Sequence, residues 1–436
     1  MTVTPDTWIQ LKRQLDADEP PPAELYVRPK RSCAQDIAEE IASDPQSKDK
    51  FLLVGARGGG KSTELREIGR LLRDDRELAE VDLDASGVSA VTVTAFDLVY
   101  LSSIAVLRLL NETQSTRAST LFESLKAAYS DEDEGDADNL GDFAAALAGL
   151  AGFATLTADA AGAMGGVPGA GTAVSTALGA LAGGIRLLPK RTGPIPETSP
   201  LGRGLQAVAN QIGAEVAETL GRPICVLVDG LEKINGQSTE RFRQVFEMTR
   251  LLADLPWAMV FAAPPCTLSE TNSVDGRGFQ TRPVWGFGPD DLDSLVEVLT
   301  KRLGVVGLRA GEQISDDDLV RLVEESGGLP RHAIKMLWRA AELARRGKLE
   351  AIDAETIDAA IDYLGETLSR GLHTQHEEEL RKTARSGLLS GSSEAATLFA
   401  DGRILALPPE KGSRRSHFAV HPLLLPGLRE AAERGR

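Results

Sequence analysis

The stretch Gly55-Ala56-Arg57-Gly58-Gly59-Gly60-Lys61-Ser62 decides the fold of this chain, because it fits the pattern G-x-x-x-x-G-K-[ST]. Before it, the apolar run 51–54 has the length and composition of a buried parallel strand. After it, residues 62–68 repeat apolar positions at helical spacing. Strand, glycine-rich loop and helix thus follow in the order in which this pattern binds phosphate. The sequence therefore predicts a phosphate-binding loop.

Each residue type in this loop has a physical reason to be there. Glycines let the backbone N–H groups wrap around phosphate oxygens, and the N-terminus of the next helix adds the positive end of its dipole. We expect Lys61 to reach the outer phosphates and Ser62 to offer its hydroxyl to Mg²⁺. The predicted cofactor-binding residues of the loop are Gly55, Arg57, Gly58, Gly59, Gly60, Lys61, Ser62 and Thr63.

Length and composition bound the class of protein. A chain of 436 residues predicts several domains, and 48 Lys+Arg against 64 Asp+Glu give a formal net charge of -16. This acidic total argues against non-specific nucleic-acid binding, although a local basic patch would not be visible in it. Cys33, Cys225 and Cys266 form no C-x-x-C pair, and the histidines are scattered, so no metal site of these residues is expected. The N-terminus shows no signal-peptide pattern, which predicts a cytoplasmic protein.

Apolar runs and helical patterns alternate along much of the chain. A helix around Trp8, Leu11 and Leu15 precedes the loop. Further strands are predicted at 81–84, 224–228 and 258–263, with helices at 96–110, 205–220 and 242–255. This alternation indicates an α/β fold, a parallel sheet covered by helices. From 290 the pattern is mostly helical, at 290–303, 316–325, 330–346 and 354–372, and short apolar runs close the chain at 398–407 and 417–425.

A carboxylate supplies the second half of a nucleotide site. Asp229 follows the hydrophobic run 224–228, so it is expected at the carboxyl end of a strand, where ligands of parallel sheets collect. There it can hold Mg²⁺ together with Ser62. Glu232 lies three residues further on and is the candidate to polarise the attacking water. Lys61, Asp229 and Glu232 are therefore the predicted catalytic residues.

Three motifs together resemble the AAA+/STAND group of P-loop ATPases. They are the loop 55–62, the segment Asp229-Gly230-Leu231-Glu232, which is similar to the NACHT-type signature, and Gly327-Gly328-Leu329-Pro330-Arg331, which is similar to the lid motif of origin-recognition-like ATPases. The resemblance extends over about two thirds of the chain. It implies that Pro330 packs near adenine and that Arg331 approaches the phosphates. The C-terminal segment 418–424 is similar to the last hairpin of a winged helix.

The resemblance has one departure that affects the expected rate. The predicted strand 258–263 ends in Ala262-Ala263-Pro264-Pro265, where many relatives place a polar residue that senses the γ-phosphate. Slow hydrolysis is therefore expected. The predicted domain map has a helical lead-in at 1–50, a P-loop ATPase core at 51–128 and 195–285, an acidic linker and helical hairpin insert at 129–194, a helical lid at 286–365 and a winged-helix-like domain at 366–436.

The insert is rich in alanine and glycine. Residues 143–188 contain two charged side chains, Asp159 and Arg186, and the uncharged run 160–185 exceeds the ~20 residues that a membrane helix needs. Because its residues are small, the free energy gained by moving the segment from water into a membrane is low. Small residues also favour close helix packing. A helical hairpin packed on its own domain or on a second subunit is predicted. Membrane contact, as in KAP-type ATPases, is the alternative.

The sequence as a whole predicts an ATP-binding and ATP-hydrolysing switch that uses Mg²⁺, in bacterial signalling, stress response or defence. We expect the chain to form a homo-oligomer or to bind a partner protein. Two alternatives remain open: a nucleotide-regulated, membrane-associated scaffold with negligible turnover, and a DNA-binding ATPase acting through the winged helix. The acidic total weakens the DNA alternative.

Overall fold

The computed structural model describes residues 4–17, 21–83, 86, 93–110, 115–130, 200–231, 245–246, 250–263, 278–408 and 417–428. The predicted insert, residues 143–188, and Glu232 lie outside these residues. Among the described helices, none is long and apolar enough to span a membrane.

A parallel sheet of five strands forms the centre of the first half of the fold. Its strands run in the order β2-β3-β4-β1-β5. All four pairings in this sheet are parallel. The strands are β1 (Lys50–Val54), β2 (Glu77–Asp82), β3 (Ile224–Asp229), β4 (Ala258–Ala263) and β5 (Gln280–Pro283).

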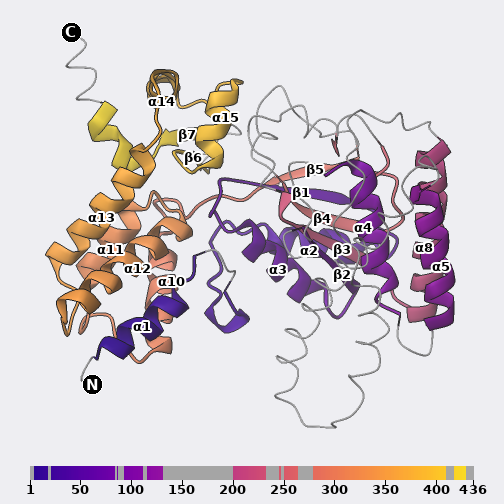
Figure 1. The fold of residues 1–436 in the computed structure, drawn as a ribbon, viewed down its shortest axis with the longest axis horizontal. Coiled ribbons are helices and arrows are strands. Elements are labelled where there is room, and N and C mark those ends of the chain that lie inside the picture. The colour runs from indigo at the N-terminus through magenta and orange to yellow at the C-terminus, as the bar shows by residue number, and fades with distance from the viewer. Residues whose placement is uncertain are drawn as a thin grey trace.

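Helices cover both faces of the sheet, which explains why its central strands are apolar throughout. Side chains alternate along β1, so that Phe51 and Leu53 pack with the helices α2 (Ala34–Ser43) and α3 (Lys61–Leu72). Leu52 and Val54 belong to the core on the other face, with α4 (Ala95–Leu107), α5 (Ser115–Ser130) and α8 (Pro200–Leu220). Figure 1 shows this arrangement. The fold is an α/β P-loop core.

A helical lid forms the second body of the fold. It consists of α10 (Leu292–Val305), α11 (Asp316–Glu325), α12 (Pro330–Gly347) and α13 (Ala354–Ser369). The N-terminal helix α1 (Pro5–Gln14) packs on α12 and α10, although it lies at the far end of the sequence (Figure 1). Trp8, Leu11 and Leu15 are buried in the lid core. The short helix η1 (Ala23–Leu25) leads from α1 back toward α2.

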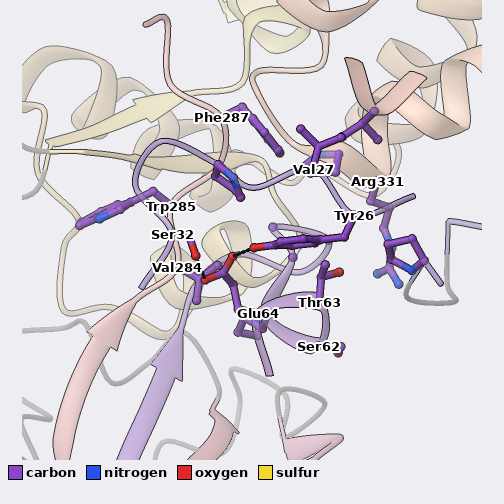
Figure 2. Close-up of a pocket in the computed structure, with 18 of the residues that line it drawn as sticks. Tyr26, Val27, Ser32, Ser62, Thr63, Glu64, Val284, Trp285, Phe287 and Arg331 are labelled. Atoms are coloured by element: carbon purple, nitrogen blue, oxygen red, sulfur yellow. Dashed lines mark hydrogen bonds between the residues drawn. The ribbon is translucent and has the colours of Figure 1, made fainter. Parts of the chain in front are cut away.

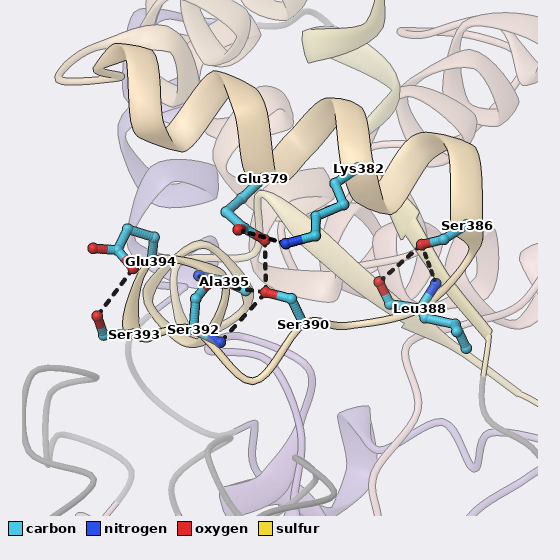
Figure 3. Close-up of polar contacts among 9 residues, drawn as sticks. All are labelled: Glu379, Lys382, Ser386, Leu388, Ser390, Ser392, Ser393, Glu394 and Ala395. Carbon is cyan, nitrogen blue, oxygen red and sulfur yellow. Dashed lines mark hydrogen bonds and ion pairs between the residues drawn. The ribbon is translucent and has the colours of Figure 1, made fainter.

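The described residues of the C-terminal part include helices and a hairpin. These are α14 (Thr374–Ser386), α15 (Ser393–Ala400) and the antiparallel pair β6 (Ile404–Leu407) and β7 (His417–Val420), followed by η8 (Pro422–Leu424). Ser392 caps α15 by accepting a hydrogen bond from the Ala395 backbone N–H at 3.1 Å. Ser390 donates to Glu379 of α14 at 2.6 Å, so these polar contacts tie the two helices together (Figure 3). The order of helices and hairpin supports the winged-helix assignment, which stays a prediction.

Most predicted elements are confirmed, with corrections at three places. The strand predicted at 81–84 is β2, which begins at Glu77 and ends at Asp82. The edge strand β5 was not predicted, since its four residues QTRP lack an apolar run. Of the helix predicted at 242–255, residues 242–244 and 247–249 lie outside the described residues, and the last part is wrong: residues 250–254 form bends and turns, and Leu255 is not helical, since Pro256 follows it.

Candidate functional site

The phosphate loop lies between β1 and α3, as predicted. Gly60 is the N-cap of α3 and has a φ of 100°. Gly58 has a φ of 80°, and a Cβ built on it would lie 2.4 Å from the Cβ of Arg331 on the lid. Both positions therefore require glycine, Gly60 for the left-handed backbone and Gly58 also for the close approach of α12.

Lys61 is buried inside the loop. Only 4% of the residue is exposed, and its Nζ donates to the carbonyl oxygens of Gly55 at 2.9 Å and Ala56 at 3.1 Å. These contacts hold the ammonium group in the loop, at the N-terminal end of α3. A buried cation at the positive end of a helix is electrostatically costly unless an anion is near. The arrangement suits an anionic ligand.

Ser62 and Asp229 are brought together from positions far apart in the sequence. The Ser62 hydroxyl donates to Asp229 Oδ1 at 3.0 Å, and the same oxygen accepts from the Gly230 backbone N–H at 2.9 Å. Asp229 is the last residue of β3, at the carboxyl edge of the sheet. A hydroxyl and a carboxylate are the hard oxygen ligands that Mg²⁺ prefers, so these two residues fit such an ion.

The lid reaches the loop through its backbone. The Arg331 N–H donates to the Gly58 carbonyl at 3.4 Å, and the Arg331 side chain donates through Nε to the Ala17 carbonyl at 3.3 Å. Pro330 is the first residue of α12, where its fixed φ is favourable. The loop also contacts the C-terminal part, because the Arg57 N–H donates to the Ala400 carbonyl at 3.1 Å. The phosphate loop is thus hydrogen-bonded to both neighbouring parts of the molecule.

Glu64 of α3 is a site residue that the sequence analysis missed. It is 3% exposed, and its Oε2 accepts from Ser32 Oγ at 2.7 Å and from the backbone N–H groups of Cys33 and Ala34, each at 3.1 Å. The Tyr26 hydroxyl donates to Oε1 at 3.3 Å (Figure 2). Burial raises the pKa of the Glu64 carboxyl, although these hydrogen bonds oppose the shift. A glutamate three residues after the loop lysine, on an otherwise apolar helix face, was the available signal.

A cavity lies between the loop, the lid and the segment that follows η1. Its volume is about 140 Å³. Figure 2 shows Tyr26, Val27, Trp285 and Phe287 around it, with Arg331 on the lid side. The loop residues from Arg57 to Thr63 and Pro330 also line it. Loop and lid residues predicted from two distant motifs therefore share one cavity.

A pair of buried histidines lies next to Arg331. His332 Nδ1 is 3.0 Å from His421 Nε2, which is also 3.1 Å from the Ser326 carbonyl oxygen. Since His421 Nδ1 accepts from the Leu423 backbone N–H at 3.3 Å, this network assigns the His421 proton to Nε2. Burial lowers the pKa of His421 to about 4 and holds that of His332 well below 6.5. The pair joins the lid to the C-terminal hairpin. No group of His, Cys, Asp and Glu that could hold a metal occurs among the residues that the structure describes.

Comparisons with known proteins find solved structures of similar fold at low sequence identity. No protein-family model matches the chain, and no curated protein sequence matches it. Among solved structures, Drosophila ORC bound to DNA is similar with a TM-score of 0.43 and 12% identity, covering 95% of this chain and 89% of that one. The Aeropyrum pernix ORC2 protein in its ADP form gives a TM-score of 0.42 and 13% identity, with 97% and 98% covered. The Thermotoga maritima RuvB Holliday junction branch migration motor gives 0.36 and 13%, with 92% and 88% covered.

Proposed function

We propose that this chain is an ATP-binding and ATP-hydrolysing switch of the AAA+/STAND type. The observation that carries the proposal is one cavity that Lys61, Ser62 and Arg331 all line, with Asp229 hydrogen-bonded to Ser62. A phosphate loop supplies the anion site, a carboxylate at the end of a neighbouring strand completes a cation site, and a lid cation reaches the loop.

The loop and the end of strand β3 have different roles in binding. In the proposal, the loop N–H groups and Lys61 bind the β and γ phosphates, and Ser62 and Asp229 hold Mg²⁺. When bound, Mg²⁺ neutralises the charge of the phosphate oxygens. The apolar wall of Tyr26, Val27 and Pro330 is the proposed place of the base.

The lid supplies the switch. Ligand pockets commonly measure roughly 300–1,000 Å³. A cavity of about 140 Å³ is smaller, so a whole nucleotide requires the lid to move away from the loop. Such a movement must break or rearrange the contact between Arg331 and Gly58. It would also affect the C-terminal part, which is hydrogen-bonded to the loop.

Hydrolysis is assigned to Glu232. In the proposed step Glu232 accepts a proton from water while the water oxygen attacks the γ-phosphorus, the bond to the β–γ bridging oxygen breaks, and ADP leaves with that electron pair. Strand β4 ends at Ala263 without a polar side chain, which supports slow turnover.

The test compares Glu232→Gln with the wild type. The variant keeps the shape of the side chain but not the charge that accepts a proton, so we expect it to bind ATP normally and to lose turnover. Phosphate release and ATP binding are measured on the same preparations. Equal rates above background in both proteins would remove Glu232 from the mechanism. A role in bacterial signalling or defence, with a partner protein or a second copy of the chain, is the proposed setting.

A further inference from the structure

The segment between η1 and α2 forms one wall of the cavity at the phosphate loop. We call residues 26–33 the strap segment. Its residues that line the cavity are Tyr26, Val27, Pro29, Arg31, Ser32 and Cys33. The phosphate loop forms a second wall, and Pro330 and Ile334 of the lid belong to a third. In the proposed function the phosphates bind to the loop, so the strap segment lies beside the base and the ribose.

The strap segment is hydrogen-bonded to the lid helix α10. The Lys30 backbone N–H donates to Oδ2 of Asp291, a buried residue directly before this helix, at 2.8 Å. Lys301 of α10 donates through Nζ to the Tyr26 carbonyl oxygen at 3.2 Å. A movement of the lid therefore pulls on the strap segment, unless contacts with the core hold the segment in place.

Glu64 holds the strap segment on the core side. Its carboxylate accepts from the Ser32 hydroxyl, from the Cys33 backbone N–H and from the Tyr26 hydroxyl (Figure 2). Both carboxylate oxygens thus accept from donors of the protein, so Glu64 acts on a ligand through the strap segment. Glu64 lies in the first turn of α3, the helix that begins with Lys61. One helical turn therefore carries the loop lysine and the acceptor that holds the neighbouring wall.

We propose that Glu64 is a positioning residue for the base and the ribose of the nucleotide, which it serves by fixing the strap segment to α3. This inference rests on the proposed binding of ATP. A wall that is ordered before the ligand arrives avoids the free-energy cost of ordering it on binding. Loss of Glu64 should therefore weaken the binding of ATP and spare that of a triphosphate that has neither base nor ribose.

The experiment measures by calorimetry how tightly the full chain binds ATP and inorganic tripolyphosphate, in one buffer with Mg²⁺ and at a temperature where each variant is folded. The ratio of the two dissociation constants is compared between variants, because the charge difference between the probes is the same for all. A role of Glu64 in folding alone leaves this ratio unchanged. Asp97→Ala is the matched control. Asp97 is also a buried carboxylate, which accepts from the backbone N–H and hydroxyl of Thr94 and from the Tyr129 hydroxyl, and it does not line the cavity.

We expect Glu64→Ala to weaken ATP binding about tenfold relative to tripolyphosphate, and Asp97→Ala to keep the ratio of the wild type. Glu64→Gln keeps an acceptor oxygen for Ser32 and should retain most of the ratio. Ser32→Ala removes the shortest contact of Glu64, at 2.7 Å, and should shift the ratio in the same direction as Glu64→Ala. It is the deciding variant if Glu64→Ala does not fold.

Three results would overturn the inference and leave the proposed function standing. The first is a wild-type ratio in Glu64→Ala, or in Ser32→Ala where only that variant folds. The second is an equal change of the ratio in Asp97→Ala. The third is equal affinity of the wild type for ATP and tripolyphosphate, since base and ribose then contribute nothing. A wild type that binds neither probe would instead contradict the proposed function, and this inference with it.

Discussion

Among single residues near the site, Glu64 is predicted to contribute to the stability of the fold. It is the shared acceptor of Ser32, Cys33 and Ala34, which begin the helix α2, and it lies on α3 directly after the loop. Glu64→Ala leaves these donors without their acceptor in a buried place. We expect it to lower the free energy of unfolding by about 2–4 kcal/mol, measured by urea denaturation. Glu64→Gln keeps one carbonyl oxygen and should lose less.

Glu67 of the same helix provides the control for this prediction. It pairs with Arg70 at 2.7 Å, and the Arg70 side chain is 54% exposed. The Glu67 side chain is 11% exposed, but its partner Arg70 reaches solvent, so Glu67→Ala is expected to lower the free energy of unfolding by less than Glu64→Ala does. An equal loss of stability in Glu64→Ala and Glu67→Ala would show that the buried acceptor contributes nothing special.

At the scale of elements, α12 is expected to transmit the state of the nucleotide. Arg331 in its first turn contacts the loop through Gly58, and a cation at this end of a helix is unfavourable unless an anion is near. We expect Arg331→Ala to bind ADP about as well as the wild type and to lose the difference between ADP and ATP states. Limited proteolysis in ADP and in a non-hydrolysable ATP analogue measures this. An undiminished ATP-specific pattern in the variant would assign the switch to another residue.

The contact between α12 and the hairpin β6–β7 predicts a pH dependence. His332 and His421 are buried in the neutral form, with pKa values below the ~6.5 of an unfolded histidine. The unfolded chain therefore binds more protons than the folded one as pH falls, so this stabilisation is complete above pH ~6.5 and declines toward pH ~4. Thermal unfolding midpoints should fall across that window. His332→Asn, which keeps an acceptor near the Nδ1 position, should flatten the decline, and an unchanged slope would contradict this account.

The sequence predicts these elements unequally, for physical reasons. The strands β1, β3 and β4 are apolar on both faces, so a pattern of residue types is enough to find them. The edge strand β5 has no such pattern. Its strand character comes from its pairing with β1 and is not visible in its residue types. Its cation Arg282 pairs instead with Glu40 at 2.7 Å.

The same contrast holds for the candidate site. Lys61, Ser62 and Asp229 could be predicted because a local motif and a strand end fix their places. Tyr26 and the histidine pair could not, since each acquires its role from a contact with a residue far along the chain, and Glu64 had as its signal only its place on an otherwise apolar helix face.

For the whole molecule, the central claim is that the loop binds ATP and that the lid responds to it. The loop contacts α12 through Gly58 and the end of α15 through Arg57, so a ligand at the loop can change contacts with both the lid and the C-terminal part. Binding to the folded state also stabilises it, by an amount that grows with ligand concentration. Affinity and stability are thus two measures of one event.

The most direct test is calorimetric titration of ATP with Mg²⁺ into the wild type, Lys61→Ala and Arg70→Ala. Arg70 lies in the last turn of the same helix, on exposed surface, and serves as the control for loss of a positive charge. We predict that the wild type and Arg70→Ala bind ATP alike and that Lys61→Ala binds about 100-fold more weakly, since it loses charge-assisted hydrogen bonds to phosphate. ATP binding of equal strength in the Lys61→Ala protein, or none in the wild type, would contradict the account.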